Sequence, residues 1–316
     1  MTTTVKLRRA GAVLFITALA SGAVPAVAQA STTTAAQVAA RALAANNAYP
    51  YTQLSITVPQ LSGPGVPAWG TKLATGLKLV VASQQAVPGR SAAGELTVYY
   101  LGTELGQVRA VGGNLYVLAD VAHWSSLPVP WGASGKSELS TIDLAVGERW
   151  FELQAATVKR LEGTTAASSP LRQVGPSPAA LRNLVATAAA KFVGGLSFKE
   201  APSAGGNFTF SAHGALQALA ANALAAGRAL HLTTASGLPK GDVVPNGTWS
   251  LVMSTTAAGR YIAHVGMGLQ AARKGSISLS LAFAHAVEPV VTPSGAKVVT
   301  PSMLSGMGLF GTSSAA

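Results

Sequence analysis

The first strand-like region begins near residue 50, where short runs rich in Leu, Val, Ile, Thr and Tyr alternate between apolar and polar positions. A period of two is typical of a strand that buries one face. The pair Gly112-Gly113 predicts a tight hairpin between the last two runs. We therefore expect strands at Thr52–Val58, Leu73–Ala82, Gly94–Leu101, Gly106–Val111 and Asn114–Ala119.

The period then changes to that of helices. Apolar residues recur at spacings of three and four in three segments, each of which predicts one apolar stripe on a helix. The intervening stretch Gly163–Ser177 is rich in Thr, Ala, Ser and Pro, which favours a surface loop. A further helix is expected near the start of the chain. The four expected helices are Ser31–Asn46, Trp150–Leu161, Leu181–Phe192 and Leu216–Leu224.

The last third returns to strands with the cleanest alternation in the chain. In Ser276–Ala286 the large apolar residues Ile277, Leu279, Leu281 and Phe283 alternate with Ser and Ala. The preceding run places Tyr261, Ala263, Val265, Met267 and Leu269 opposite Ile262, His264, two glycines and Gln270. Short connections between such strands predict an antiparallel meander with one shared apolar face.

The N-terminus resembles a secretory signal peptide. Lys6, Arg8 and Arg9 precede an apolar run from Ala10 to Ala20, and Ala28-Gln29-Ala30 provides a small-residue exit. We expect cleavage after Ala30, with residues 31–316 as a single domain that is secreted or resides in the cell envelope. The alternative is an uncleaved anchor, although the apolar run is short for a spanning helix.

Composition favours burial of apolar surface. The chain has 49% apolar and 10% charged residues and no cysteine, so neither a disulfide nor a lipid-anchored cysteine is available. Three of the 22 basic residues lie in the leader, which leaves 19 basic against 11 acidic residues, a net charge of +8. The positive charges are scattered. They favour peripheral contact with an anionic membrane surface, and the lack of a basic stripe with interleaved aromatics disfavours nucleic acid.

Motifs for catalysis are weak. Pro130–Ser137 approaches a phosphate-binding loop but begins with Pro, and Ser294–Lys297 has Ser-x-x-Lys spacing in a turn and not on a helix. The five histidines are far apart in the sequence, and the acidic residues are dispersed. We therefore expect a protein that is not an enzyme and has no metal and no cofactor. The pair Asp120 and His123 is interpreted as a solvated strand end.

Two stretches carry a family resemblance. The segment Leu101–Trp124 is similar to the strand-hairpin-strand core of the LolA-like lipoprotein carriers, and most similar to that of the actinobacterial glycolipid-binding lipoproteins of the LppX and LprG type. The second stretch, Ile277–Pro301, contains the alternating strand, then Glu288-Pro289-Val290-Val291, and ends in Val298–Pro301. The chain lacks the anchor cysteine of those lipoproteins, which favours a protein without a membrane tether.

The resemblance implies an α+β fold in which a strongly curved antiparallel sheet, a half-barrel, holds helices in its concave face around an apolar cavity. A sheet with one apolar face needs such a cover. We expect binding and transport of a lipid, lipoglycan or other amphiphile, with a lipid or glycolipid as partner. The alternatives are a structural or interaction protein of the envelope without a ligand cavity, and an exported hydrolase. The expected cavity residues are Val98, Tyr100, Leu115, Val117, Leu184, Phe192, Val265, Met267, Leu279, Leu281 and Phe283.

Overall fold

The computed structural model describes residues 41–42, 45–46, 49–86, 91–147, 149–158, 196–202, 207–229, 246–256, 261–285 and 288–300. Its twelve described strands are almost all antiparallel and combine with a few helices, so the chain has an α+β fold. It divides into two compact units. Unit 1 comprises Met1–Tyr49, Ser62–Pro64 and Pro176–Phe283, and unit 2 comprises Pro50–Leu61, Gly65–Gly175 and Ala284–Ala316. Whether the chain folds as one domain stays a prediction.

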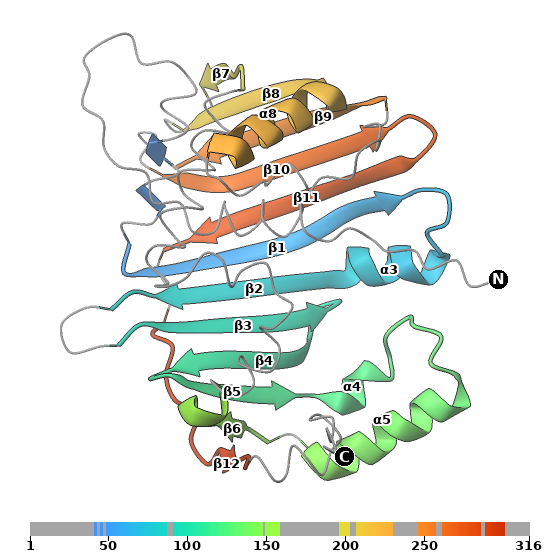
Figure 1. Ribbon diagram of the computed structural model, residues 1–316, viewed down its shortest axis with the longest axis vertical. Helices are drawn as coiled ribbons and strands as arrows, with labels where there is room; N and C mark the ends of the chain where they lie inside the picture. Colours follow the sequence, from blue (N-terminus) through green and yellow to red (C-terminus); the bar gives the residue numbers. More distant parts are fainter. Residues whose placement is uncertain are drawn as a thin grey trace, which may run out of the picture. The chain divides into compact units, whose positions relative to one another are not determined.

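Unit 2 contains an open sheet with the strand order β12-β6-β5-β4-β3-β2-β1 (Figure 1). All of its neighbouring strands are antiparallel except β6 and β12, which run parallel. The strands are β1 (Tyr51–Ser62), β2 (Leu77–Gln84), β3 (Ala93–Tyr100), β4 (Thr103–Val111), β5 (Asn114–Ala119), β6 (Phe151–Leu153) and β12 (Lys297–Val298). The helices are α3 (Ala68–Gly76), α4 (Val121–Trp124) and α5 (Gly132–Val146).

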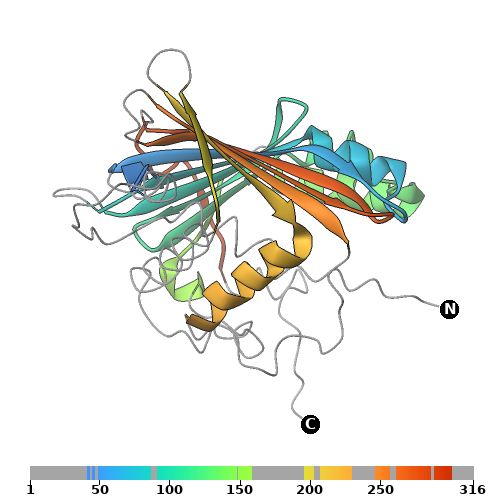
Figure 2. The ribbon, with the colours of Figure 1, turned by 90° about the horizontal axis from the view of Figure 1, so that it is seen from above.

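Unit 1 contains the strand order β11-β10-β9-β8-β7, again antiparallel. The strands are β7 (Lys199–Pro202), β8 (Phe208–Ala215), β9 (Gly247–Thr255), β10 (Ile262–Ala271) and β11 (Gly275–Ala284). Helix α8 (Leu216–Ala229) follows β8 directly and lies beside one face of the strands of its own unit (Figure 2). The predicted meander of the last third is therefore confirmed.

Two predictions of local structure are wrong, and one helix was missed. The expected strand Leu73–Ala82 begins as a helix, because α3 runs from Ala68 to Gly76 and β2 starts only at Leu77. The expected helix Trp150–Leu161 begins as a strand, since Phe151–Leu153 forms β6 beside β5. Helix α5 was not predicted at all. The expected helix Leu181–Phe192 lies outside the described residues, as does most of Ser31–Asn46.

A bulge corrects the expected faces of β10. The pairing of β10 with β9 shifts between Ile262 and His264, so the strict alternation fails at Ala263. Ile262, predicted on the polar side, is fully buried, with 0% of its surface exposed. From Val265 onward the predicted alternation agrees with the register.

Candidate functional site

The strands of unit 2 have one apolar and one polar face. Because side chains alternate along each strand and partners in register share a face, the pairings assign every residue to one side. All the charged side chains of β2–β6 fall on the side of Thr97, the polar face of unit 2. The other side, the apolar face of unit 2, carries Leu77, Leu79, Val81, Leu96, Val98, Tyr100, Val108, Leu115, Val117, Phe151 and Leu153.

Burial of β2–β6 is the reverse of the usual pattern. None of the eleven residues just named is buried, and Leu96 is 36% exposed. On β1, by contrast, Leu54 and Ile56 share this face and are buried. The fully buried residues of these strands lie on the polar face, apart from Leu105 at a bulge in β4. They are Val80, Gln84, Thr97 and Tyr116. A sheet in water normally buries its apolar face and exposes its polar one, so the apolar face of unit 2 has surface left to cover along β2–β6.

An ion-pair network organises the polar face. Arg109 Nε lies 2.7 Å from Glu95 Oε2, and the Arg109 guanidinium lies 4.9 Å from the centre of the Trp150 ring. Arg109 Nη1 also donates a hydrogen bond of 3.2 Å to the carbonyl oxygen of Val291. Beside this pair, Gln107 Nε2 donates to Thr97 Oγ1 over 3.0 Å. These contacts explain how polar side chains are accommodated with little exposure.

The segment 288–300 helps to cover this polar face. Its Lys297 N–H donates to the Trp150 carbonyl and its Val299 N–H donates to the Glu152 carbonyl, both over 2.8 Å. Val290 and Val299 are buried, with 8% and 6% of their surface exposed. The two hydrogen bonds to Trp150 and Glu152 extend the edge of the sheet as β12 beside β6. The carbonyl of Val291, which accepts from Arg109 Nη1, places the earlier part of the segment on the polar face.

Two groups on the polar face have shifted pKa values. Burial raises the pKa of the Glu104 carboxyl above its ordinary value of 4.5, and the negative charges of Glu95 and Asp120 raise it further, against the opposing effect of Arg109. Burial, together with Glu104 and Glu95, raises the pKa of the Tyr99 hydroxyl. The charged form of Glu104 is thus disfavoured in the folded protein.

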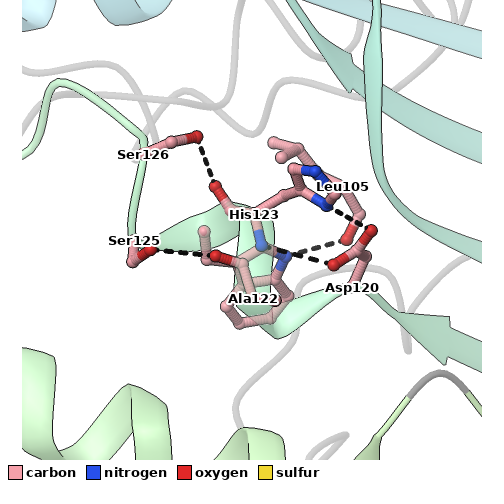
Figure 3. A network of polar contacts seen from close by, with 7 residues as sticks. Leu105, Asp120, Ala122, His123, Ser125 and Ser126 are labelled. Atoms are coloured by element: carbon pink, nitrogen blue, oxygen red, sulfur yellow. Dashed lines mark hydrogen bonds and ion pairs between the residues drawn. The ribbon is translucent and has the colours of Figure 1, made fainter.

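The loop after β5 is held by Asp120 (Figure 3). Asp120 is the N-cap of α4, where its Oδ1 accepts from the His123 N–H over 3.3 Å and its Oδ2 contacts His123 Nδ1. The hydroxyls of Ser125 and Ser126 donate to the carbonyls of Ala122 and His123. Both serines are thus bonded to the main chain, and the imidazole contact joins two residues of one turn. The predicted solvated strand end is therefore a helix cap.

Unit 1 has a second apolar face, which three rows of side chains form across β8–β11. Its first row is fully buried, with exposures of 0–3%. The rows are Phe210, Met253, Val265 and Leu281; Ala212, Leu251, Met267 and Leu279; and Gly214, Trp249, Leu269 and Ile277. The opposite side carries Ser, Gly and His, including a hydrogen bond of 2.8 Å between His264 Nε2 and Ser280 Oγ.

The expected cavity residues separate into two sets. Val98, Tyr100, Leu115 and Val117 share the apolar face of unit 2. In unit 1, Val265, Met267, Leu279, Leu281 and Phe283 share an apolar face, on which Val265 and Leu281 are fully buried. Leu184 and Phe192 lie outside the described residues.

Sequence reasoning missed several members of these faces. Leu79 and Leu96 were left out although their strands were predicted, and Trp249, Leu251 and Met253 were left out because β9 was not predicted. The alternation in Thr248–Thr255, which has large apolar residues at every second position, was the available signal.

Comparison with known proteins gives no relative: no protein-family model matches the chain, and no curated protein matches it. Among the described residues, no group of three His, Asp or Glu side chains is placed to hold a metal ion. None of the helices in the described part of the chain is long and apolar enough to cross a membrane.

Proposed function

We propose that this protein binds a lipid, glycolipid or similar amphiphile without catalysis and carries it in the cell envelope or outside the cell. The observation that carries the proposal is the reversed burial of β2–β6. The apolar face of unit 2 presents eleven half-buried or exposed large side chains there, whereas the polar face is the covered one. An acyl chain laid on such a face removes apolar surface from water on both partners.

The chemistry of this face suits an acyl chain. No charged side chain of β2–β6 lies on it, so a hydrocarbon can be seated there without desolvating an ion. Each methylene that becomes buried contributes about 0.8 kcal/mol. A few methylenes in contact with Leu96, Val98 and their neighbours therefore provide substantial binding energy.

A finer proposal concerns the fold. The half-barrel with helices in its concave face, expected from the similarity to the LolA-like carriers, would turn the apolar face into a cavity wall. The α+β composition and the mostly antiparallel strands support it. Export through the N-terminal leader is part of the same proposal, because a carrier of envelope lipids must reach them.

Two matched variants test the proposal. Leu96→Gln places a polar group on the apolar face, and Leu101→Gln makes the same change at a leucine that is 76% exposed in the turn after β3. Binding is measured by titration with an environment-sensitive fluorescent fatty acid. We expect about threefold to tenfold weaker binding for Leu96→Gln and no change for Leu101→Gln. Equal affinity of both variants and the unmodified protein would reject this face as the site.

A further inference from the structure

Trp249 on β9 has a buried indole nitrogen without a hydrogen-bond partner. The residue is 6% exposed, and the described residues offer no acceptor to its Nε1. Trp131 also has an unpaired ring nitrogen, but it precedes α5 and does not lie on a sheet. Trp249 is therefore an unpaired donor on an otherwise apolar sheet face.

Gly214 on β8 lies in register with Trp249 and places no side chain against the nitrogen edge of the ring. A Cβ added at Gly214 would lie 3.1 Å from Nε1. A larger residue at position 214 would therefore press on the ring. On the other side the row continues through Leu269 and Ile277, which are only half-buried. The apolar face of unit 1 is thus packed around Phe210 and Trp249 and is less covered at Leu269 and Ile277.

An indole nitrogen can only donate, so its missing partner must be an acceptor, such as a carbonyl oxygen. Buried polar groups in folded proteins are nearly always paired, and an unpaired donor is destabilising. Among amphiphiles, a lipid ester or a fatty acid carries an acyl carbonyl oxygen directly beside its hydrocarbon chain. This pairing matches an indole N–H that lies beside Gly214, in a row that continues through Leu269 and Ile277.

We propose that Trp249 anchors the acyl carbonyl of an amphiphile bound on the apolar face of unit 1 through its indole N–H, with the adjoining hydrocarbon on Leu269 and Ile277. The inference rests on the proposed function, since it requires a lipid ligand, and it adds selectivity for acyl compounds over plain hydrocarbons. It also gives unit 1 a binding role of its own.

The test compares two ligands on three proteins. Methyl palmitate and hexadecane compete against the fluorescent fatty acid on the delipidated wild-type protein, on Trp249→Phe and on Trp69→Phe. Trp69 is 40% exposed on α3 and serves as the matched control. We expect Trp249→Phe to weaken methyl palmitate binding about fivefold and leave hexadecane unchanged. Trp69→Phe should alter neither.

A second readout measures ligand binding on the wild-type protein and uses the variant only to assign a signal. In protein labelled with ¹⁵N-tryptophan, the Trp249 indole proton, assigned by its loss in Trp249→Phe, should move downfield when methyl palmitate is added and stay in place with hexadecane. If Trp249→Phe keeps the wild-type ratio of its affinities for methyl palmitate and hexadecane, the inference is overturned while the proposed function stays intact. An indole proton that is already downfield without lipid and insensitive to the ester would overturn it too, because a bound water would then be its partner. Failure of the wild-type protein to bind either ligand would reject the proposed function itself.

Discussion

Truncating one leucine on each apolar face should separate packed core from binding surface. Leu281 is 3% exposed and lies in register with Val265, which is fully buried. Leu281→Ala removes packed atoms and leaves a cavity, so we expect the free energy of unfolding to fall by about 2–5 kcal/mol. Leu96 is 36% exposed. Because water already reaches Leu96, Leu96→Ala should lower the free energy of unfolding by only about 1 kcal/mol.

The assay is urea unfolding of the delipidated protein, followed by circular dichroism, with the slope checked for each variant. Ligand titration then gives the complementary result: Leu96→Ala should bind the fluorescent fatty acid more weakly, although its stability is nearly normal. A cost above about 2 kcal/mol for both variants, with unchanged ligand binding in Leu96→Ala, would refute the reasoning. The apolar face of unit 2 would then be ordinary core.

Three further predictions concern single side chains of unit 2. Glu104→Gln should raise the free energy of unfolding at neutral pH and leave it unchanged below pH 4.5, the ordinary pKa of a glutamate. Because burial raises the pKa of Glu104 in the folded protein, the wild-type protein loses stability as the pH rises above 4.5; urea unfolding at several pH values checks this. Asp120→Ala should lower the free energy of unfolding by about 1 kcal/mol in the same assay through loss of the α4 cap, and Asp120→Asn should restore most of it. Trp124→Phe should cost about 1–3 kcal/mol, since Trp124 Nε1 donates to the Leu105 carbonyl over 2.8 Å; an unchanged urea midpoint would contradict that bond.

The sequence predicted strands best where alternation was strong and turns were marked. Asn114–Ala119 was found because a run of large apolar residues follows the Gly112-Gly113 turn, and the strand around Ile277 was found because large apolar residues alternate with Ser and Ala. The segment after Trp150 was misassigned because its strand depends on distant partners. Glu152 is held by Asn114 Nδ2 over 2.7 Å, and that contact spans 38 residues. Local periodicity cannot report such a pairing.

The faces of the candidate site followed from the sequence, but their burial did not. Alternation alone places Val98 and Val117 on one side of their strands, and the register confirms that they share a face with Val108 on the strand between them. Nothing local to these residues shows that the segment 288–300 covers the opposite side, because its contact with Arg109 spans 182 residues. The reversed burial of β2–β6 therefore emerged only from the three-dimensional arrangement.

Native mass spectrometry of the exported chain tests the central claim most directly. The protein is purified from the envelope or medium of an expressing bacterium under conditions that retain bound lipid, and its mass is measured before and after organic extraction. The account predicts a mature chain with an added mass that extraction removes and that yields an acyl lipid. A chain of bare polypeptide mass, which also fails to take up added fatty acid or methyl palmitate, would contradict it.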